Sequence, residues 1–363
     1  EDVRSPRGVA CITFSNEAAR ELIRRLRQLG LEQSPRLFVG TVHSFCLLHL
    51  LLPFAQLAGL ELPYPLKVAT ESEAASIYRA VADRLRGVGQ PVRKEEVDRH
   101  RRVNLDRDSK AWTQNEEMTG LAAAFEQELR KQGLIDFEDI VHYGQRLVNE
   151  HDWVLKVIRA KFPVLAVDEY QDLGAALDRI VRRLTFDAGV RLFAVGDVDQ
   201  SVYGFTGANS ELLEELSKAN DVETIRLKIN YRSGTGIIEV AQRALGKDRG
   251  YESSEPERQA SVQAHKCDKG LQHQAEYAMQ TLVPAALAAK KGRQLGDIAV
   301  LYRNRNVGDA AAIEAVKAKY PFVRIDNAAP YRKVPLTSWV EDCAIWCAGG
   351  WKVSSPRRCP ALC

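Results

Sequence analysis

The sequence repeats one order of apolar and polar positions: a short apolar run, a few small or polar residues, then a stretch with helical periodicity. Four such runs are Val9–Phe14, Leu37–Val39, Val164–Val167 and Leu192–Val195. The stretches behind them predict helices, one ending at Gly30, one beginning near His43 and one capped by Asn209. Apolar strands alternating with amphipathic helices are typical of a parallel sheet covered by helices. The pattern therefore predicts an α/β fold.

Residues 72–130 interrupt this alternation. Glu71–Leu85 has helical periodicity, and Arg93–Lys110 is dense in charges of both signs. We expect a helical insertion here, so that residues 1–71 and 131–224 form two parts of one sheet domain.

A second α/β unit is expected to begin near Ile225. The pattern predicts a helix capped by Ser233, a loop over Gly246–Gly270, a helix near His273–Ala289 and a strand at Ile298–Tyr302. We therefore assign residues 225–330 to the beginning of a second domain. Residues 331–363 are an uncertain tail or the start of a second insertion.

The amino-acid composition limits the classes of binding partner that the sequence indicates. Among 363 residues, 51 Lys and Arg face 48 Asp and Glu, a net charge of +3, so any nucleic-acid surface must be local. No apolar run approaches the roughly 20 residues of a membrane span, and no secretory signal opens the chain. We expect a cytoplasmic protein. Because the first residue is Glu1, we expect a fragment or a processed product.

The seven cysteines do not form a disulfide framework in a chain of this length, which indicates a reducing compartment. Four of them form two C-x3-C pairs, Cys343 with Cys347 and Cys359 with Cys363. A metal site is one interpretation. The other is that Cys343 and Cys347 lie one helical turn apart on an apolar face.

The strongest local signal is the segment Val164-Leu-Ala-Val-Asp168-Glu169-Tyr-Gln-Asp172, an apolar strand that ends in two adjacent carboxylates. Ligands of open α/β sheets bind just outside such strand ends. There Asp168 would hold Mg²⁺ through water, and Glu169 would orient or deprotonate an attacking water. The alternative is a solvated helix cap behind a buried strand.

A second strand ends in a similar segment, Gly196–Ala208. Gln200 would contact a terminal phosphate or its attacking water. Tyr203 and Phe205 alternate with small residues and would stack on bases, unless they belong to the core. Further along, Asn230-Tyr-Arg-Ser233 precedes a helix, where Arg232 would reach a phosphate site as an arginine finger.

Together these segments resemble the UvrD/Rep/PcrA branch of superfamily 1 DNA helicases. Asp168–Asp172 is similar to the family's D-E-F-Q-D box, with Tyr170 for Phe. Gly196–Ala208 is similar to its G-D-x-x-Q-S-I-Y-x-F/W-R-G-A box, and Asn230–Ser233 to its N-Y-R-S motif. Shorter segments add to the resemblance: Ile12–Ala19, Gly40–Phe45, Leu134–Phe137 and Asp297–Arg303. The resemblance covers about Val9–Arg303.

The resemblance implies two RecA-like domains (P-loop NTPase type), an ATP site between them and a track for single-stranded DNA. Asp168 would bind Mg²⁺ and Glu169 would be the catalytic base. Gln200 and Arg232 would contact the γ-phosphate, and Tyr231 would stack on adenine. The residues expected to meet DNA are Thr13, Phe14, Asn16, Thr41, His43, Tyr203 and Phe205. Phe45, in contrast, is expected in the core.

Two departures qualify the resemblance. The sequence contains no G-x4-G-K-[ST] phosphate loop (Walker A), and the family's C-terminal motifs are also absent from it. We expect that the phosphate loop lies before Glu1 in a longer parent, and that this chain alone does not hydrolyse ATP. In addition, Thr206 stands where the family usually has Arg.

The sequence therefore predicts part of a bacterial, nucleoid-associated, ATP-dependent helicase. The parent would move 3′ to 5′ on single-stranded DNA and unwind duplex junctions in repair or replication. Two alternatives stay open: a helicase subunit of a recombination helicase–nuclease, and a non-catalytic relic that binds single-stranded DNA.

Overall fold

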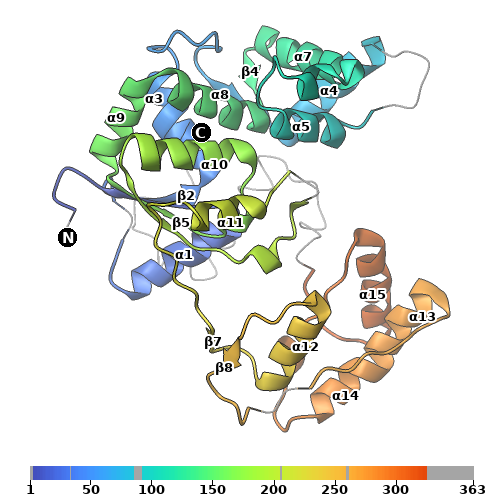
Figure 1. Cartoon of the computed structure of the whole chain (residues 1–363). Helices are drawn as coiled ribbons and strands as arrows, with labels where there is room; N and C mark the ends of the chain where they lie inside the picture. Colours follow the sequence, from blue (N-terminus) through green and yellow to red (C-terminus); the bar gives the residue numbers. More distant parts are fainter. Residues whose placement is uncertain (1–2, 33, 86–91, 205–206, 259–260, 325–363) are drawn as a thin grey trace, which may run out of the picture. The chain divides into compact units, whose positions relative to one another are not determined.

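The structure of the chain is a computed structural model that describes residues 3–32, 34–85, 92–204, 207–258 and 261–324 (Figure 1). The described residues divide into two compact units. The first comprises Glu1–Asn230 with Ala241–Glu252, and the second comprises Tyr231–Val240 with Ser253–Cys363. Phe205, Thr206 and the four C-terminal cysteines lie outside the described residues.

The first unit is built on a four-stranded sheet in the order β2-β1-β5-β6. Its strands are β1 (Val9–Thr13), β2 (Leu37–Thr41), β5 (Val164–Val167) and β6 (Arg191–Ala194). All three pairings are parallel, and the register places Thr13 beside Thr41 and Val167 beside Ala194. The α/β fold with a parallel sheet is confirmed.

Helices cover both faces of this sheet. Helix α1 (Asn16–Gln28) follows β1 and starts at Ser15, whose hydroxyl accepts a hydrogen bond from the Ala18 N–H at 3.1 Å. In Figure 1, α1 and α10 (Ala175–Arg182) lie on opposite sides of the sheet. Alternate strand residues, such as Ile12 and Leu165, enter the main apolar core. The last strand, β6, is less covered, and Phe193 is 66% exposed.

The predicted helices after β2 and β6 form with differences in detail. After β2 come α2 (Val42–Phe45), a π-helical segment (Cys46–Leu51) and α3 (Leu52–Phe54). After β6, a 3-10 turn (Val198–Gln200) precedes α11 (Glu211–Ser217). The cap of α11 is Ser210 rather than Asn209, although the Asn209 side chain accepts a hydrogen bond from the Glu211 N–H at 3.0 Å.

Between β2 and β5, the chain forms helices with an apolar core of their own. The elements are β3 (Lys67–Val68), α4 (Glu71–Leu85), α5 (Lys94–Val103), α6 (Lys110–Thr113), α7 (Glu116–Lys131) and β4 (Leu134–Ile135). Trp112, Phe125 and Leu129 are among the buried residues of this second core. We call residues 71–131 the helical insertion. Helices α8 (Phe137–Glu150) and α9 (Asp152–Lys161) return to the sheet.

The next elements along the chain are β7 (Ile229–Asn230), α12 (Thr235–Leu245) and β8 (Glu252–Ser253), and β7 and β8 form a two-stranded pair. The remaining elements of the second unit are α13 (Gly270–Tyr277), a π-helical segment (Ala278–Leu282), α14 (Val283–Ala288), a 3-10 turn (Leu295–Asp297) and α15 (Arg305–Lys317). Met279, Val283, Ala311 and Ala315 form its small core.

The strand predicted at Ile298–Tyr302 is wrong, because these residues have no regular secondary structure. Leu301 is 93% exposed, and in the described part of the second unit no strand of a larger sheet is available to pair with this segment. An isolated extended segment has no ladder of hydrogen bonds to hold it as a strand. The domain boundaries expected from the sequence stay predictions.

No helix among the described residues combines the length and the apolar character that a bilayer-spanning segment requires.

Candidate functional site

The carboxyl ends of the four parallel strands meet at one edge of the sheet, which we call the strand-end edge. Directly after β1, β2, β5 and β6 come Phe14, Val42, Asp168 and Val195. The backbone ladder continues to this edge, because the Asp168 N–H donates to the Ile12 carbonyl at 2.9 Å. Residues far apart in the sequence are thereby brought together where ligands of open α/β sheets bind.

Two carboxylates leave β5 at this edge. Asp168 is half-buried and Glu169 is exposed, whereas the next residue, Tyr170, is completely buried and donates its hydroxyl to Asp178 at 2.7 Å. Glu169 itself has φ 56° and ψ 45°, the left-handed region that non-glycine residues rarely adopt. Such strain persists only where the surrounding structure holds it, and it is concentrated at functional sites.

A chain of hydrogen bonds connects Glu169 with the segment after β6. The buried Gln171 donates its amide to Glu169 at 2.7 Å, and its carbonyl oxygen accepts from the Asp197 N–H at 3.0 Å. The Gln200 amide in turn donates to the Asp197 carboxylate at 2.8 Å. A Cβ on Gly196 would lie 2.6 Å from the Gln171 Oε1, so this close packing requires glycine.

The charges at this edge fit a cation. Burial and, second to it, the charge of Glu169 raise the pKa of Asp168, and the same two causes raise the pKa of Asp172. The Asp172 Oδ1 is buried without a hydrogen-bond partner. Among the described residues, no group of three or more His, Cys, Asp or Glu side chains is placed to hold a metal ion. A Mg²⁺ ion held by one carboxylate, water and phosphates needs none.

Aromatic side chains lie at the same edge. The rings of Phe14 and Tyr203 are 4.9 Å apart, and both side chains are half-buried. Asn16 is exposed, and Thr41 is buried as the cap of α2, with its hydroxyl accepting from the Ser44 N–H at 3.2 Å. Phe45 is 1% exposed, which confirms its prediction as a core residue.

Thr13, which was predicted to contact DNA, differs from Phe14 and Asn16 in its exposure. Its side chain is completely buried, so it is not available to DNA in this conformation. Thr13 is the last residue of β1, which lies between β2 and β5 in the sheet, and the half-buried Phe14 follows it directly.

Phe137 is a residue of this edge to which the sequence pattern gave no role. It is the first residue of α8, is 58% exposed, and its ring lies 5.1 Å from that of His43. Burial and, second to it, the charge of Arg102 lower the pKa of His43 to about 4, so this imidazole is neutral at pH 7. The signal available in the sequence was an apolar residue directly behind the Asp136 helix cap.

The remaining predicted residues belong to the second unit or lie outside the described residues. Tyr231 and Arg232 belong to the second unit, and both are exposed. Phe205 lies outside the described residues.

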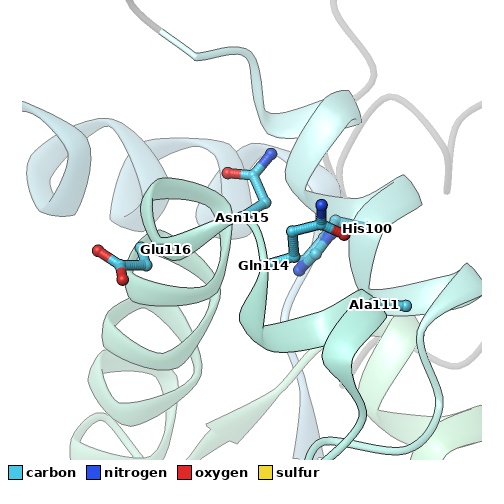
Figure 2. Close-up of a pocket in the computed structure, with 5 residues that line it drawn as sticks. All are labelled: His100, Ala111, Gln114, Asn115 and Glu116. Carbon is cyan, nitrogen blue, oxygen red and sulfur yellow. The ribbon is translucent and has the colours of Figure 1, made fainter.

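A separate hollow of about 570 Å³ lies on the helical insertion (Figure 2). It is lined by His100, Ala111, Gln114, Asn115 and Glu116. None of the site residues predicted from the sequence is among these. The His100 ring stacks on Trp112 at 4.6 Å, and the Arg107 guanidinium lies 3.7 Å from the centre of the Trp112 ring. This hollow belongs to the packing of the insertion.

The parallel sheet, with two carboxylates behind one strand and a glutamine behind its neighbour, defines a RecA-like α/β domain of the helicase type. Residues 2–221 match the family described as the UvrD/REP helicase N-terminal domain. The chain belongs to this family.

The curated relatives agree with the family. The chain is 24% identical over 347 residues to "ATP-dependent DNA helicase PcrA" of Staphylococcus aureus, covering 90% of this chain and 46% of the relative. It is 25% identical over 346 residues to "ATP-dependent DNA helicase UvrD1" of Mycobacterium tuberculosis, covering 90% of this chain and 44% of the relative. The chain thus spans less than half the length of these relatives.

Proposed function

We propose that the chain is part of an ATP-dependent DNA helicase that couples ATP hydrolysis to 3′-to-5′ movement on single-stranded DNA and to duplex unwinding, in bacterial DNA repair or replication. The observation that carries this proposal is the hydrogen-bonded chain from Glu169 through Gln171 and Asp197 to Gln200. It connects the carboxylates behind β5 with the amide behind β6, which supports a base and a water-orienting amide acting at one site.

In this proposal, Glu169 accepts a proton from the water whose oxygen attacks the γ-phosphorus, while the bond from that phosphorus to ADP breaks. Gln200 orients the attacking water or the γ-phosphate. Arg232 neutralises charge in the transition state, and Tyr231 stacks on adenine. Asp168 would hold Mg²⁺, which would neutralise charge on the phosphates when bound.

Single-stranded DNA would bind along the strand-end edge. Phe137 is exposed and would offer its ring face to a base, and the half-buried rings of Phe14 and Tyr203 lie at the same edge. His43 packs against Phe137, and Asn16 and Thr41 stand at the starts of the helices beside these rings. Phe205 belongs to the same sequence motif as Tyr203 and is proposed to act with it. Base stacking of this kind is nearly independent of sequence, as movement along DNA requires.

The test of hydrolysis uses the full-length protein with ATP, Mg²⁺ and single-stranded DNA. We expect DNA-stimulated turnover that Glu169→Gln abolishes while nucleotide binding, measured by fluorescence, is retained, because the amide keeps the shape but cannot accept the proton. Near-normal turnover of Glu169→Gln would remove Glu169 from the role of base. DNA binding with no hydrolysis by the unmutated protein would instead favour the non-catalytic DNA binder.

The sequence printed here has no phosphate loop, and this chain by itself is accordingly expected not to turn over ATP. Purified chain and its Glu169→Gln variant should give the same background rate with DNA present. DNA-stimulated turnover by the chain alone would show that phosphates are bound without such a loop.

The test of the DNA edge compares two exposed phenylalanines. Phe137 lies at the strand-end edge, whereas Phe186 is 40% exposed in the segment that precedes the other end of β6. Phe137→Ala should weaken binding of single-stranded DNA by about 1–3 kcal/mol with little dependence on base sequence. Phe186→Ala should leave it unchanged in fluorescence anisotropy. Equal effects of the two substitutions would contradict the assignment of the edge.

A further inference from the structure

The turn that carries Gln200 is held on two sides. On one side, Asp197 caps the turn by accepting from the Asp199 N–H at 3.0 Å, and it also accepts the Gln200 amide. On the other side, the Asp199 carboxylate contacts the loop that follows α12. The three-residue 3-10 turn has one backbone hydrogen bond between residues three positions apart, from the Gln200 N–H to the Asp197 carbonyl. Contacts of its side chains are therefore needed to fix the turn.

The second support is an ion pair between residues 50 positions apart in the sequence. The Arg249 guanidinium donates twice to Asp199, with Nε 2.7 Å from Oδ2 and Nη2 2.9 Å from Oδ1. A two-pronged contact of this kind fixes direction as well as distance. The Asp199 side chain is only 7% exposed, and the hydrogen bond from Arg249 is the main cause that lowers its pKa. Lys247 adds a weaker contact at 3.4 Å.

The loop that presents Arg249 is itself built onto the end of α12. The Lys247 N–H donates to the Gln242 carbonyl at 3.2 Å, and the Gln242 amide donates to the Asp248 carboxylate at 3.1 Å. Asp248 then accepts the Gly250 N–H at 2.8 Å, with Gly250 at φ +66°. Arg249 is therefore a fixed extension of the C-terminal end of α12, the helix that follows the Asn230–Ser233 segment in the sequence.

From these contacts we infer that Asp199 and Arg249 are a positioning pair, which sets the turn of Gln200 against the strand-end edge and joins that turn, within the first unit, to the loop that follows α12. Neither residue touches the reacting atoms. The inference rests on the proposed function, because it assigns a role toward Gln200 in ATP hydrolysis. If Gln200 acts on the terminal phosphate only in the transition state, loss of the pair slows turnover and leaves nucleotide affinity nearly unchanged.

The experiment measures kcat and KM for DNA-stimulated ATP hydrolysis in the full-length protein. Arg249→Ala should lower kcat by about 10- to 100-fold, because a displacement of about 1 Å at a catalytic group has effects of this size. The KM for ATP and the affinity for single-stranded DNA should stay within about two-fold. Arg249→Lys should recover part of kcat, since one ionic contact returns without the two-pronged geometry.

Two further variants keep the result unambiguous. Lys247→Ala is the matched control from the same loop, and it should keep at least half of the normal kcat because its contact is longer and its side chain is 57% exposed. The double variant Asp199→Arg with Arg249→Asp restores the pair with reversed charges and should exceed either single variant in kcat. This comparison decides the question even if Arg249→Ala alone folds poorly.

The outcomes separate this inference from the proposed function. Turnover that Glu169→Gln abolishes but Arg249→Ala leaves equal to Lys247→Ala would overturn the positioning pair alone. A KM that rises in step with the fall in kcat, or a double variant no better than the singles, would do the same. An unmutated protein with no DNA-stimulated turnover would instead overturn the proposed function on which the pair depends.

Discussion

Two regions of the first unit differ in how their carboxylates are paired with arginine. At the junction between the helical insertion and α8, Arg101 is 1% exposed and meets four carboxylates: Glu126 at 2.7 Å, Asp136 at 2.6 Å, Asp139 at 2.8 Å and Asp98 at 3.6 Å. At the strand-end edge, burial and, second to it, the charge of Glu169 raise the pKa of Asp168 and of Asp172, and the charge of Arg25 partly offsets this at Asp168.

The difference separates structural charges from functional ones. At the junction the buried Arg101 is paired with Glu126, Asp136 and Asp139 inside the protein, so this network holds the insertion on the sheet domain and needs no ligand. The strand-end edge leaves charge uncompensated and a carboxylate oxygen unpartnered, which costs stability but leaves room for a cation and phosphates. Phe137 stands between the two, directly behind Asp136, so the network also fixes the aromatic side of the edge.

The largest effect is expected from breaking the junction. Arg101→Ala leaves several buried carboxylates without their counter-charge, and the free energy of unfolding should fall by about 3–5 kcal/mol. Urea denaturation of the purified chain measures this. The matched control is Arg99→Ala, an exposed arginine on the same helix, which should change stability by no more than about 0.5 kcal/mol. Similar losses from both would mean that the network contributes little.

A smaller effect is expected from Glu138, which faces Arg102 at 3.0 Å across the junction. Burial raises its pKa from 4.5 to about 7; the charges of Arg102 and Arg101 oppose this, and those of Asp98 and Asp136 add to it. The folded chain therefore holds a proton that the unfolded chain releases between pH 4.5 and about 7. The stabilisation from this proton is complete below pH 4.5 and is lost as pH rises to 7.

Glu138→Gln tests that sign. Relative to the variant, the unmutated chain should lose about 1–3 kcal/mol of unfolding free energy between pH 5 and pH 8, as measured by urea denaturation at each pH. Glu95→Gln, at an exposed position of α5, serves as the control and should follow the unmutated chain. A difference between the Glu138→Gln variant and the unmutated chain that is constant across this range would show that Glu138 stays ionised throughout.

The sequence predicted the parts of the fold that depend on local pattern. The four strands of the sheet form within a few residues of their apolar runs, and Phe45 is in the core as expected. The pattern failed at Ile298–Tyr302, because five apolar-rich residues cannot show whether a neighbouring strand is present to pair with them.

The sequence indicated which types of side chain stand at the candidate site, but it did not indicate which side chains contact one another there. Asp168, Glu169 and Gln200 could be named as candidates because ligands of open α/β sheets bind at strand ends. The position of Arg232 relative to these three residues stays a prediction. The pairing of Asp199 with Arg249 spans 50 positions and follows no periodicity, so no sequence pattern predicts it. The same holds for Phe137, whose exposure depends on how α8 returns from the insertion.

The smallest effect is expected at Glu169, where the comparison can be made most sharply. Its left-handed backbone costs energy that asparagine largely avoids, because the short Asn side chain is tolerated in this region. Glu169→Asn also removes one of the repelling carboxylates. We expect the free energy of unfolding to rise by about 0.5–1 kcal/mol.

Glu169→Gln is the matched control, since it removes the same charge but keeps a long side chain with no special tolerance for a positive φ. It should gain less than Glu169→Asn in the same denaturation experiment, while both variants lose the DNA-stimulated turnover of the full-length protein. A gain in stability that accompanies a loss of turnover is the expected mark of a residue held in strain for function. If Glu169→Asn destabilises the chain, the hydrogen bond from Gln171 to Glu169 contributes more than the backbone strain costs. Glu169 would then stabilise the fold, as the paired carboxylates of the junction do.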